Sequence, residues 1–176
     1  VDSTASATTT GASGATADAN ADADATNVVA IQDLGDGAGD FSFGNDATIT
    51  ANAGTSADQV QVSGAATTTT GDATATADST LISGINDVTG TDGAVSNVLS
   101  VGDNATITGR GYADVDASAT STTGNATGTA TTAAVDGIQA DSITAGGDAA
   151  VKAFANTSSD AVASTTDGDA AATNTL

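Results

Sequence analysis

Small apolar and polar residues alternate along many short stretches of the chain. The clearest stretches are residues 47–51, 58–62 and 113–117. An alternation of period two sends one set of side chains to each face of a β-strand, and the β-branched Thr, Val and Ile favour strands. In residues 105–108, this alternation assigns Ala105 and Ile107 to one face and Thr106 and Thr108 to the other. The pattern therefore predicts an all-β chain.

One eight-residue motif recurs from one end of the chain to the other. It opens with a turn pair such as Gly-Asp or Gly-Asn, and its fullest copies are residues 44–51 and 102–109. Gly, Asp and Asn tolerate the positive φ angles of tight turns. Aligned copies share an Ala residue at Ala15, Ala47, Ala73, Ala105, Ala126, Ala149 and Ala170. The last three steps are 21, 23 and 21 residues long, and the earlier steps of 32 and 26 residues indicate the same unit with added loops.

A longer period is superimposed on these octets. Thr-rich segments precede alternate octets at residues 7–11, 66–71, 119–124 and 164–168. Between them, Ile31, Ile85 and Ile138 lie in similar apolar segments, 54 and 53 residues apart. We therefore predict a single repeat domain over residues 1–176, with about three modules of two turns each and a partial module at the C-terminal end.

A unit of 21 to 23 residues is long enough for one turn of a β-solenoid. Strands of successive turns stack about 4.8 Å apart, so roughly eight turns would form a rod on the order of 40 Å long. Ala and Thr inside would keep the rod narrow, and Val, Ile and Leu would fill its wider layers. The alternative fold is a β-sandwich built from two or three similar modules, because its turns would be spaced similarly.

Composition raises disorder as a further alternative, because large apolar residues are few and aromatic residues are only 2%. The phased repeats argue for a folded chain, since each repeat of a solenoid buries its face only against its neighbours.

The net charge of -20 comes from Asp, and Arg110 and Lys152 are the only basic residues. Such a surface repels nucleic acid and anionic lipid, and no apolar stretch reaches about 18 residues. We predict neither nucleic-acid binding nor membrane insertion.

Side chains that carry catalysis are scarce. His and Cys are absent, which excludes imidazole catalysis, thiol nucleophiles and the usual zinc sites. The carboxylate pairs Asp22/Asp24 and Asp114/Asp116 have i, i+2 spacing, which places both members on one solvated strand face. Carboxylate pairs can hydrolyse glycosides, but these lack the aromatic platforms of sugar clefts. We predict that the protein is not an enzyme.

The chain has one candidate calcium site and three candidate glycosylation sites. Asp33, Asp36 and Asp40 lie in a Gly-rich loop, and clustered Asp oxygens in such turns suit Ca²⁺; residues 87–92 form a thinner second candidate. The alternative is a solvated surface loop, and no other cofactor is predicted. The pattern Asn-X-Ser/Thr, which also arises by chance in an Asn- and Thr-rich chain, marks candidate glycosylation sites. These are Asn104, Asn125 and Asn156.

Thr-X-Thr pairs lie in several of the predicted strands. If the octets were successive turns, the pairs would stack into one flat ladder of hydroxyl groups, the geometry of an ice-binding face. The residues are Thr48, Thr50, Thr74, Thr76, Thr106, Thr108, Thr127 and Thr129. Residues 149–151 interrupt the ladder, and an outward Thr is also simply a good strand residue.

The segments at residues 101–108 and 143–151 resemble the repeats of large bacterial surface β-solenoids, the adhesins of the filamentous-haemagglutinin type. They are also similar to the Gly-Asn-Ala coils of trimeric autotransporter heads. The resemblance covers the octets, and the steps of 32 and 26 residues depart from both families. It implies an exported, surface-displayed and non-catalytic structural role.

The C-terminal residues from Val162 to Leu176 match the start of a further module, which would leave an open sheet edge. A neighbouring copy could cover this edge by stacking or by donating a strand. We therefore predict a structural subunit of an extracellular or cell-surface filament or adhesin, assembled head to tail from copies of itself. An excerpt of a longer repetitive adhesin fits equally well. The first residues contain no charged segment followed by an apolar run, so we expect any export signal to have been removed already or never to have been part of this segment.

Overall fold

The computed structural model describes residues 2–11, 15–32, 42–87 and 98–176, which form strands and connecting turns without a helix. The strands belong to four sheets. Sheet A contains β1 (Asp2–Thr9), β5 (Thr48–Ala53), β6 (Val60–Thr70), β10 (Thr106–Thr123) and β14 (Ala150–Asp167). Sheet B contains β2 (Ala19–Ala25), β7 (Ala73–Ser79), β11 (Ala126–Thr132) and β15 (Ala170–Thr175). Sheet C contains β3 (Val28–Gln32), β8 (Ile82–Asp87) and β12 (Val135–Ala140), and sheet D contains β4 (Ser42–Phe43), β9 (Val98–Val101) and β13 (Ser142–Ala145).

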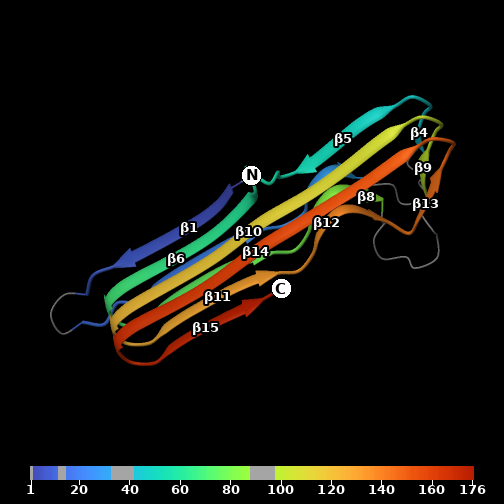
Figure 1. Cartoon of the computed structure of the whole chain (residues 1–176). Coiled ribbons are helices and arrows are strands. Elements are labelled where there is room, and N and C mark those ends of the chain that lie inside the picture. Colours follow the sequence, from blue (N-terminus) through green and yellow to red (C-terminus); the bar gives the residue numbers. More distant parts are fainter. Residues whose placement is uncertain (1, 12–14, 33–41, 88–97) are drawn as a thin grey trace.

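The chain visits the sheets in the order A, B, C, D and then returns to A. Each circuit forms one layer: β1 to β4 are layer 1, β5 to β9 layer 2, β10 to β13 layer 3, and β14 with β15 layer 4. The long strands β10 and β14 run along most of the molecule, whereas β5 and β6 pair with successive halves of β10 (Figure 1). All strand pairs among the described residues are parallel. The all-β prediction is confirmed, and the pairing differs from that of an antiparallel β-sandwich.

The strand register pairs whole modules rather than successive octets. In sheet B, Ala19, Ala73, Ala126 and Ala170 lie in register, with steps of 54, 53 and 44 residues. Alternate octets, such as the one that opens β10, instead lead into sheet A. The predicted turn of 21 to 23 residues, and with it the two-turn module and the rod of eight turns, is therefore wrong. Four layers at about 4.8 Å give a stack on the order of 20 Å thick.

The structure confirms one part of the predicted repeat alignment and contradicts another. Ile31, Ile85 and Ile138 do lie in register along sheet C, so the longer period was identified correctly. Ala15 is not in register with the other octets, because Ala19 occupies that place in layer 1. Residues 15–18 belong to the turn before β2, where the Gly of the motif is replaced by Ala17.

The interior has a thin part and a wider part, side by side in each layer. Between the second half of sheet A and sheet B, the inward side chains are mostly Ala, and β2 alternates strictly between buried and exposed residues. Between the first half of sheet A and sheets C and D, larger residues fill the space, including Ile85, Leu99 and Ile107. The sequence predicted Ala and Thr inside, with the larger residues in separate layers; Ala is inside, but the predictions for Thr and for separate layers are wrong. Thr lies mainly on outward positions of these strands.

Glycine brings sheets A and C into backbone contact. A Cβ atom at Gly109 would lie 2.1 Å from the carbonyl oxygen of Gly137, and one at Gly84 would lie 2.3 Å from the amide nitrogen of Arg110. Real Cβ atoms do not approach a backbone atom this closely, so only glycine fits at these positions.

Among the described residues, no helix capable of crossing a bilayer is found.

Candidate functional site

Inward hydroxyl groups close the turn that joins sheet A to sheet B. Thr9, Thr68, Ser121 and Thr165 lie in register at the end of sheet A. The hydroxyls of Thr9 and Thr68 donate to the carbonyl oxygen of Ala17 at 2.9 and 2.6 Å. Ser121 donates to Gly71 at 2.7 Å, and Thr165 donates to Gly124 at 2.8 Å. The inward hydroxyl residues of the Thr-rich segments therefore tie the end of sheet A to the turn that follows it.

A second ladder runs along the outside of the same turn, through Asp18, Asp72, Asn125 and Asp169. Between successive layers, the side-chain oxygen of one of these residues accepts a hydrogen bond from the backbone N–H of the corresponding residue in the next layer. Asp72 N–H donates to Asp18 Oδ1 at 2.9 Å, Asn125 N–H to Asp72 Oδ1 at 2.8 Å, and Asp169 N–H to Asn125 Oδ1 at 3.0 Å. We call these four residues the Asx ladder. Because it spans all four layers, it fixes their register at this turn.

The turn between sheets D and A carries a shorter ladder of the same kind. Asp103 N–H donates to Asn45 Oδ1 at 2.9 Å, and Gly147 N–H donates to Asp103 Oδ1 at 2.7 Å. The next residues along the chain have positive φ angles of 55° at Asn104 and 57° at Asp148. Asp and Asn tolerate this left-handed conformation, so the turns predicted at the octet starts are confirmed here. The ladder ends at Gly147, which has no side chain to accept a further bond.

The outer face of sheet A carries a regular array of hydroxyl groups. Thr8, Thr67, Thr120 and Ser164 form one column through all four layers. Two positions further along their strands, Thr69, Thr122 and Thr166 precede the registered Thr70, Thr123 and Asp167. All seven of these hydroxyl-bearing residues are exposed. We call them the hydroxyl array; strand geometry sets its spacing at about 4.8 Å between layers and about 6.7 Å along each strand.

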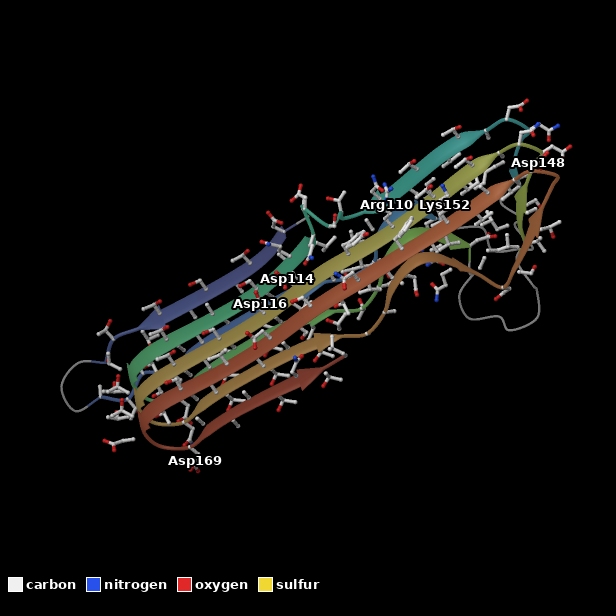
Figure 2. All side chains as sticks on the ribbon, in the orientation of Figure 1. Arg110, Asp114, Asp116, Asp148, Lys152 and Asp169 are labelled. Carbon is white, nitrogen blue, oxygen red and sulfur yellow. The ribbon has the colours of Figure 1, made fainter. Side chains whose placement is uncertain are left out.

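Charged groups on the same face are separated along the long strands. Arg110 and Lys152 lie together on the half nearer sheets C and D, whereas Asp114 and Asp116 lie in the middle (Figure 2). The guanidinium of Arg110 lies 5.6 Å from the ring centre of Phe154, a cation–π contact, and its Nη1 donates to Asn52 Oδ1 at 3.3 Å.

Asp116 is paired in register with Asp160 on the next strand. Burial raises the pKa of Asp116, and the nearby carboxylates of Asp114 and Asp160 raise it further. These carboxylates are therefore a local source of repulsion, in a chain with a net charge of -20.

The predicted calcium residues Asp33, Asp36 and Asp40 lie outside the described residues. Most of the second candidate, residues 87–92, also lies outside them. The structure does bring together the carboxylates of Asp22, Asp24 and Asp78, whose oxygen atoms lie within 4.8 Å of one another. Asp24 and Asp78 are register partners. Sequence reasoning noticed the pair Asp22/Asp24 but missed Asp78, because only the 54-residue register reveals it.

The three Asn residues of the glycosylation pattern are all exposed. Asn104 lies in the turn before β10, and Asn156 lies on β14. Asn125 is a member of the Asx ladder, and its Oδ1 atom accepts the hydrogen bond from Asp169.

The eight Thr residues predicted as one ladder lie on two different sheets. In sheet A, Thr48 and Thr50 pair with Thr106 and Thr108, and Ala150 and Lys152 follow in layer 4. In sheet B, Thr74 and Thr76 pair with Thr127 and Thr129. Thr108 is only 7% exposed, between Thr50 and Lys152. A continuous ladder of all four pairs therefore does not form. The hydroxyl array instead lies on the Thr-rich segments that precede alternate octets. The recurrence of these segments in the sequence is the signal from which the array could have been predicted.

Comparisons of the chain with protein-family models, with curated proteins and with solved structures find no match.

Proposed function

We propose that the chain is a β-solenoid and a non-enzymatic structural subunit of an extracellular or cell-surface filament, assembled head to tail from copies of itself. The observation that carries this proposal is the pair of open strand edges. In the described residues, β14 and β15 pair with layer 3 on one side and present their other edge unpaired. At the opposite end, β1 and β2 pair only with layer 2. Unpaired edges of this kind are templates for another chain.

The orientation of the strands supports head-to-tail growth rather than pairing of like ends. All strands of one sheet run in the same direction, so a second copy that stacks in the same orientation continues the parallel ladders of sheet B and of the half of sheet A that contains β1. Contacts between the front of one copy and the back of the next do not close, and they generate a filament. The absence of His, Cys and Met, which carry reactive or oxidisable side chains, suits a structural role outside the cell.

Electron microscopy and fibre diffraction of the purified chain test this function. Four layers at about 4.8 Å predict an axial repeat of about 19 Å per chain, with a strong reflection at about 4.8 Å along the filament axis. Salt should promote assembly, because screening weakens repulsion between copies of charge -20. A chain that stays monomeric over a wide range of concentration and salt in sedimentation experiments would contradict the proposal.

The hydroxyl array favours a second candidate function, binding to ice. It provides two columns of exposed hydroxyls on parallel, registered strands, and a rigid periodic surface can order water in a lattice. Thermal hysteresis and ice recrystallisation assays on the wild-type chain provide the test. Thr67→Tyr should abolish activity by disrupting the array. Thr127→Tyr, at an exposed position of sheet B outside the array, is the matched control. The absence of hysteresis in concentrated wild-type protein removes this candidate.

A further inference from the structure

The Asx ladder is a repeating unit of two hydrogen bonds that is incomplete at both ends of the stack. Beside each side-chain bond, the residue after the ladder position donates its backbone N–H to the ladder residue of the next layer. Ala19 N–H donates to Asp72 O at 3.0 Å, Ala73 N–H to Asn125 O at 2.9 Å, and Ala126 N–H to Asp169 O at 2.9 Å. Asp72, Asn125 and Asp169 thus each donate with the backbone N–H and accept with the carbonyl oxygen.

The two ends of this ladder are complementary. At layer 4, no donor among the described residues is bonded to the Asp169 carboxylate, which lies at the exposed turn between β14 and β15 (Figure 2). At layer 1, the N–H of Asp18 has no such partner among the residues that the structure describes, whereas Asp72, Asn125 and Asp169 each have one. One end therefore presents an acceptor and the other presents the matching donor.

We propose that copies of the chain join through this ladder, with the Asp169 carboxylate accepting the N–H of Asp18 of the next copy. Ala170 N–H donates to the carbonyl oxygen of the same Asp18, which repeats the two-bond unit across the joint. The proposal rests on the head-to-tail filament and specifies its register. In sheet A the next copy keeps the same register, so that its Thr8 lies beside Ser164.

The interior at the two ends supports this register. Val62 and Val115 occupy one inward position in layers 2 and 3 and are fully buried. In the end layers, the same position holds Ser3 and Ser159, both half-buried. Asn174 Nδ2 donates to the carbonyl oxygen of Ser159 at 2.5 Å, and the Ser159 hydroxyl donates to the Asn174 amide oxygen. The joint therefore places polar groups of one end against a polar group of the other, rather than against valine.

On sheet B, the charges at the joint are also compatible. Extending the register by one layer places Asp22 and Asp24 of the next copy beside Thr173 and Thr175. Like charges in directly opposite positions destabilise a sheet, and the joint avoids such pairs on sheet B. The shorter ladder at the other turn ends in Gly147 and offers no acceptor. Of these two ladders of the described residues, the one at the turn between sheets A and B can therefore continue into the next copy.

Variants at Asp169 test the hydrogen bond separately from the charge. Asp169→Ala removes the acceptor and should raise the critical concentration for assembly about tenfold, which corresponds to about 1.4 kcal/mol. Asp169→Asn keeps an amide oxygen, the acceptor that Asn125 already supplies within the ladder, and should stay within about threefold of wild type. Asp148→Asn removes the same charge from another exposed turn of layer 4 and should also stay close to wild type. Equal effects of Ala and Asn at position 169 would overturn the role of the ladder.

Disulfide trapping tests the register directly, because the chain contains no cysteine. Paired strands lie about 4.8 Å apart, within the Cα separation of about 4.4 to 6.8 Å that a disulfide needs. A Thr8→Cys/Ser164→Cys variant should form disulfide-linked oligomers on oxidation, whereas Thr8→Cys/Ser158→Cys, whose second site is six residues away on the same strand, should not. Filaments without the first cross-link would overturn this joint while leaving the filament itself intact. Wild-type chain that forms no filament at all would overturn the proposed function and the joint with it.

Discussion

Gly109→Ala is the substitution for which the structure gives the clearest physical expectation. The new Cβ atom would lie 2.1 Å from the carbonyl oxygen of Gly137 and 2.5 Å from Cγ1 of Ile138. Ordinary contact begins at 3.4 Å, so the opposing carbonyl must move by about 1.3 Å in a close-packed interior. A side chain could rotate away from such a clash, but the backbone of β12 can move only with its sheet.

Overpacking of a core typically costs 1 to 3 kcal/mol, and a clash with backbone belongs at the upper end of that range. Replacing Gly by Ala also restricts the unfolded chain, which restores about 0.4 to 1 kcal/mol. We therefore expect Gly109→Ala to lower the free energy of unfolding by about 2 kcal/mol. Typical domains have only about 5 to 15 kcal/mol in total, so the effect should be easily measured.

Urea unfolding followed by far-UV circular dichroism measures this change, with the slope m showing whether the unfolding transition is otherwise the same. Gly44→Ala is the matched control, because a Cβ atom at Gly44 would meet nothing within 4 Å. Its free energy of unfolding should stay within about 0.5 kcal/mol of wild type. If Gly109→Ala is as stable as this control, the close contact between sheets A and C does not exist.

Three further predictions concern the turn, the acidic face and the overall charge. Ser121→Ala removes the 2.7 Å hydrogen bond to Gly71 O and should lower the free energy of unfolding by about 1 kcal/mol in urea; an unchanged midpoint would contradict that role. Because burial, Asp114 and Asp160 raise the pKa of Asp116, its protonated form is favoured by folding. Stability should therefore rise as the pH falls through this raised pKa, with the gain complete below the ordinary value of 3.8. Asp116→Asn should flatten that part of the pH profile, and a profile identical to wild type would argue against the shift. Sodium chloride should raise the urea midpoint of the monomer, because screening weakens repulsion within a chain of charge -20; a lowered midpoint would refute this.

Local features of the fold could be predicted because they depend on neighbouring residues alone. The alternation in residues 105–108 predicted that Ala105 and Ile107 share one face, since successive side chains of a strand point to opposite faces, and both residues are buried. The Gly-Asp and Gly-Asn pairs marked turns, because these residues tolerate positive φ. Spacing in the sequence also identified the registered Ile31, Ile85 and Ile138.

The strands, the alternation of their faces and the long repeat follow from local residue patterns, whereas the choice of neighbouring strands emerges only when the whole chain folds. Every octet looks alike locally, yet the octets at Ala105 and Ala126 lead into different sheets because the chain closes only after a full circuit of four sheets. That longer circuit splits the predicted Thr ladder in two, and it brings Gly109 against Gly137. Strand pairing is a contact between distant residues, and no local period specifies the path that the connecting turns take between them.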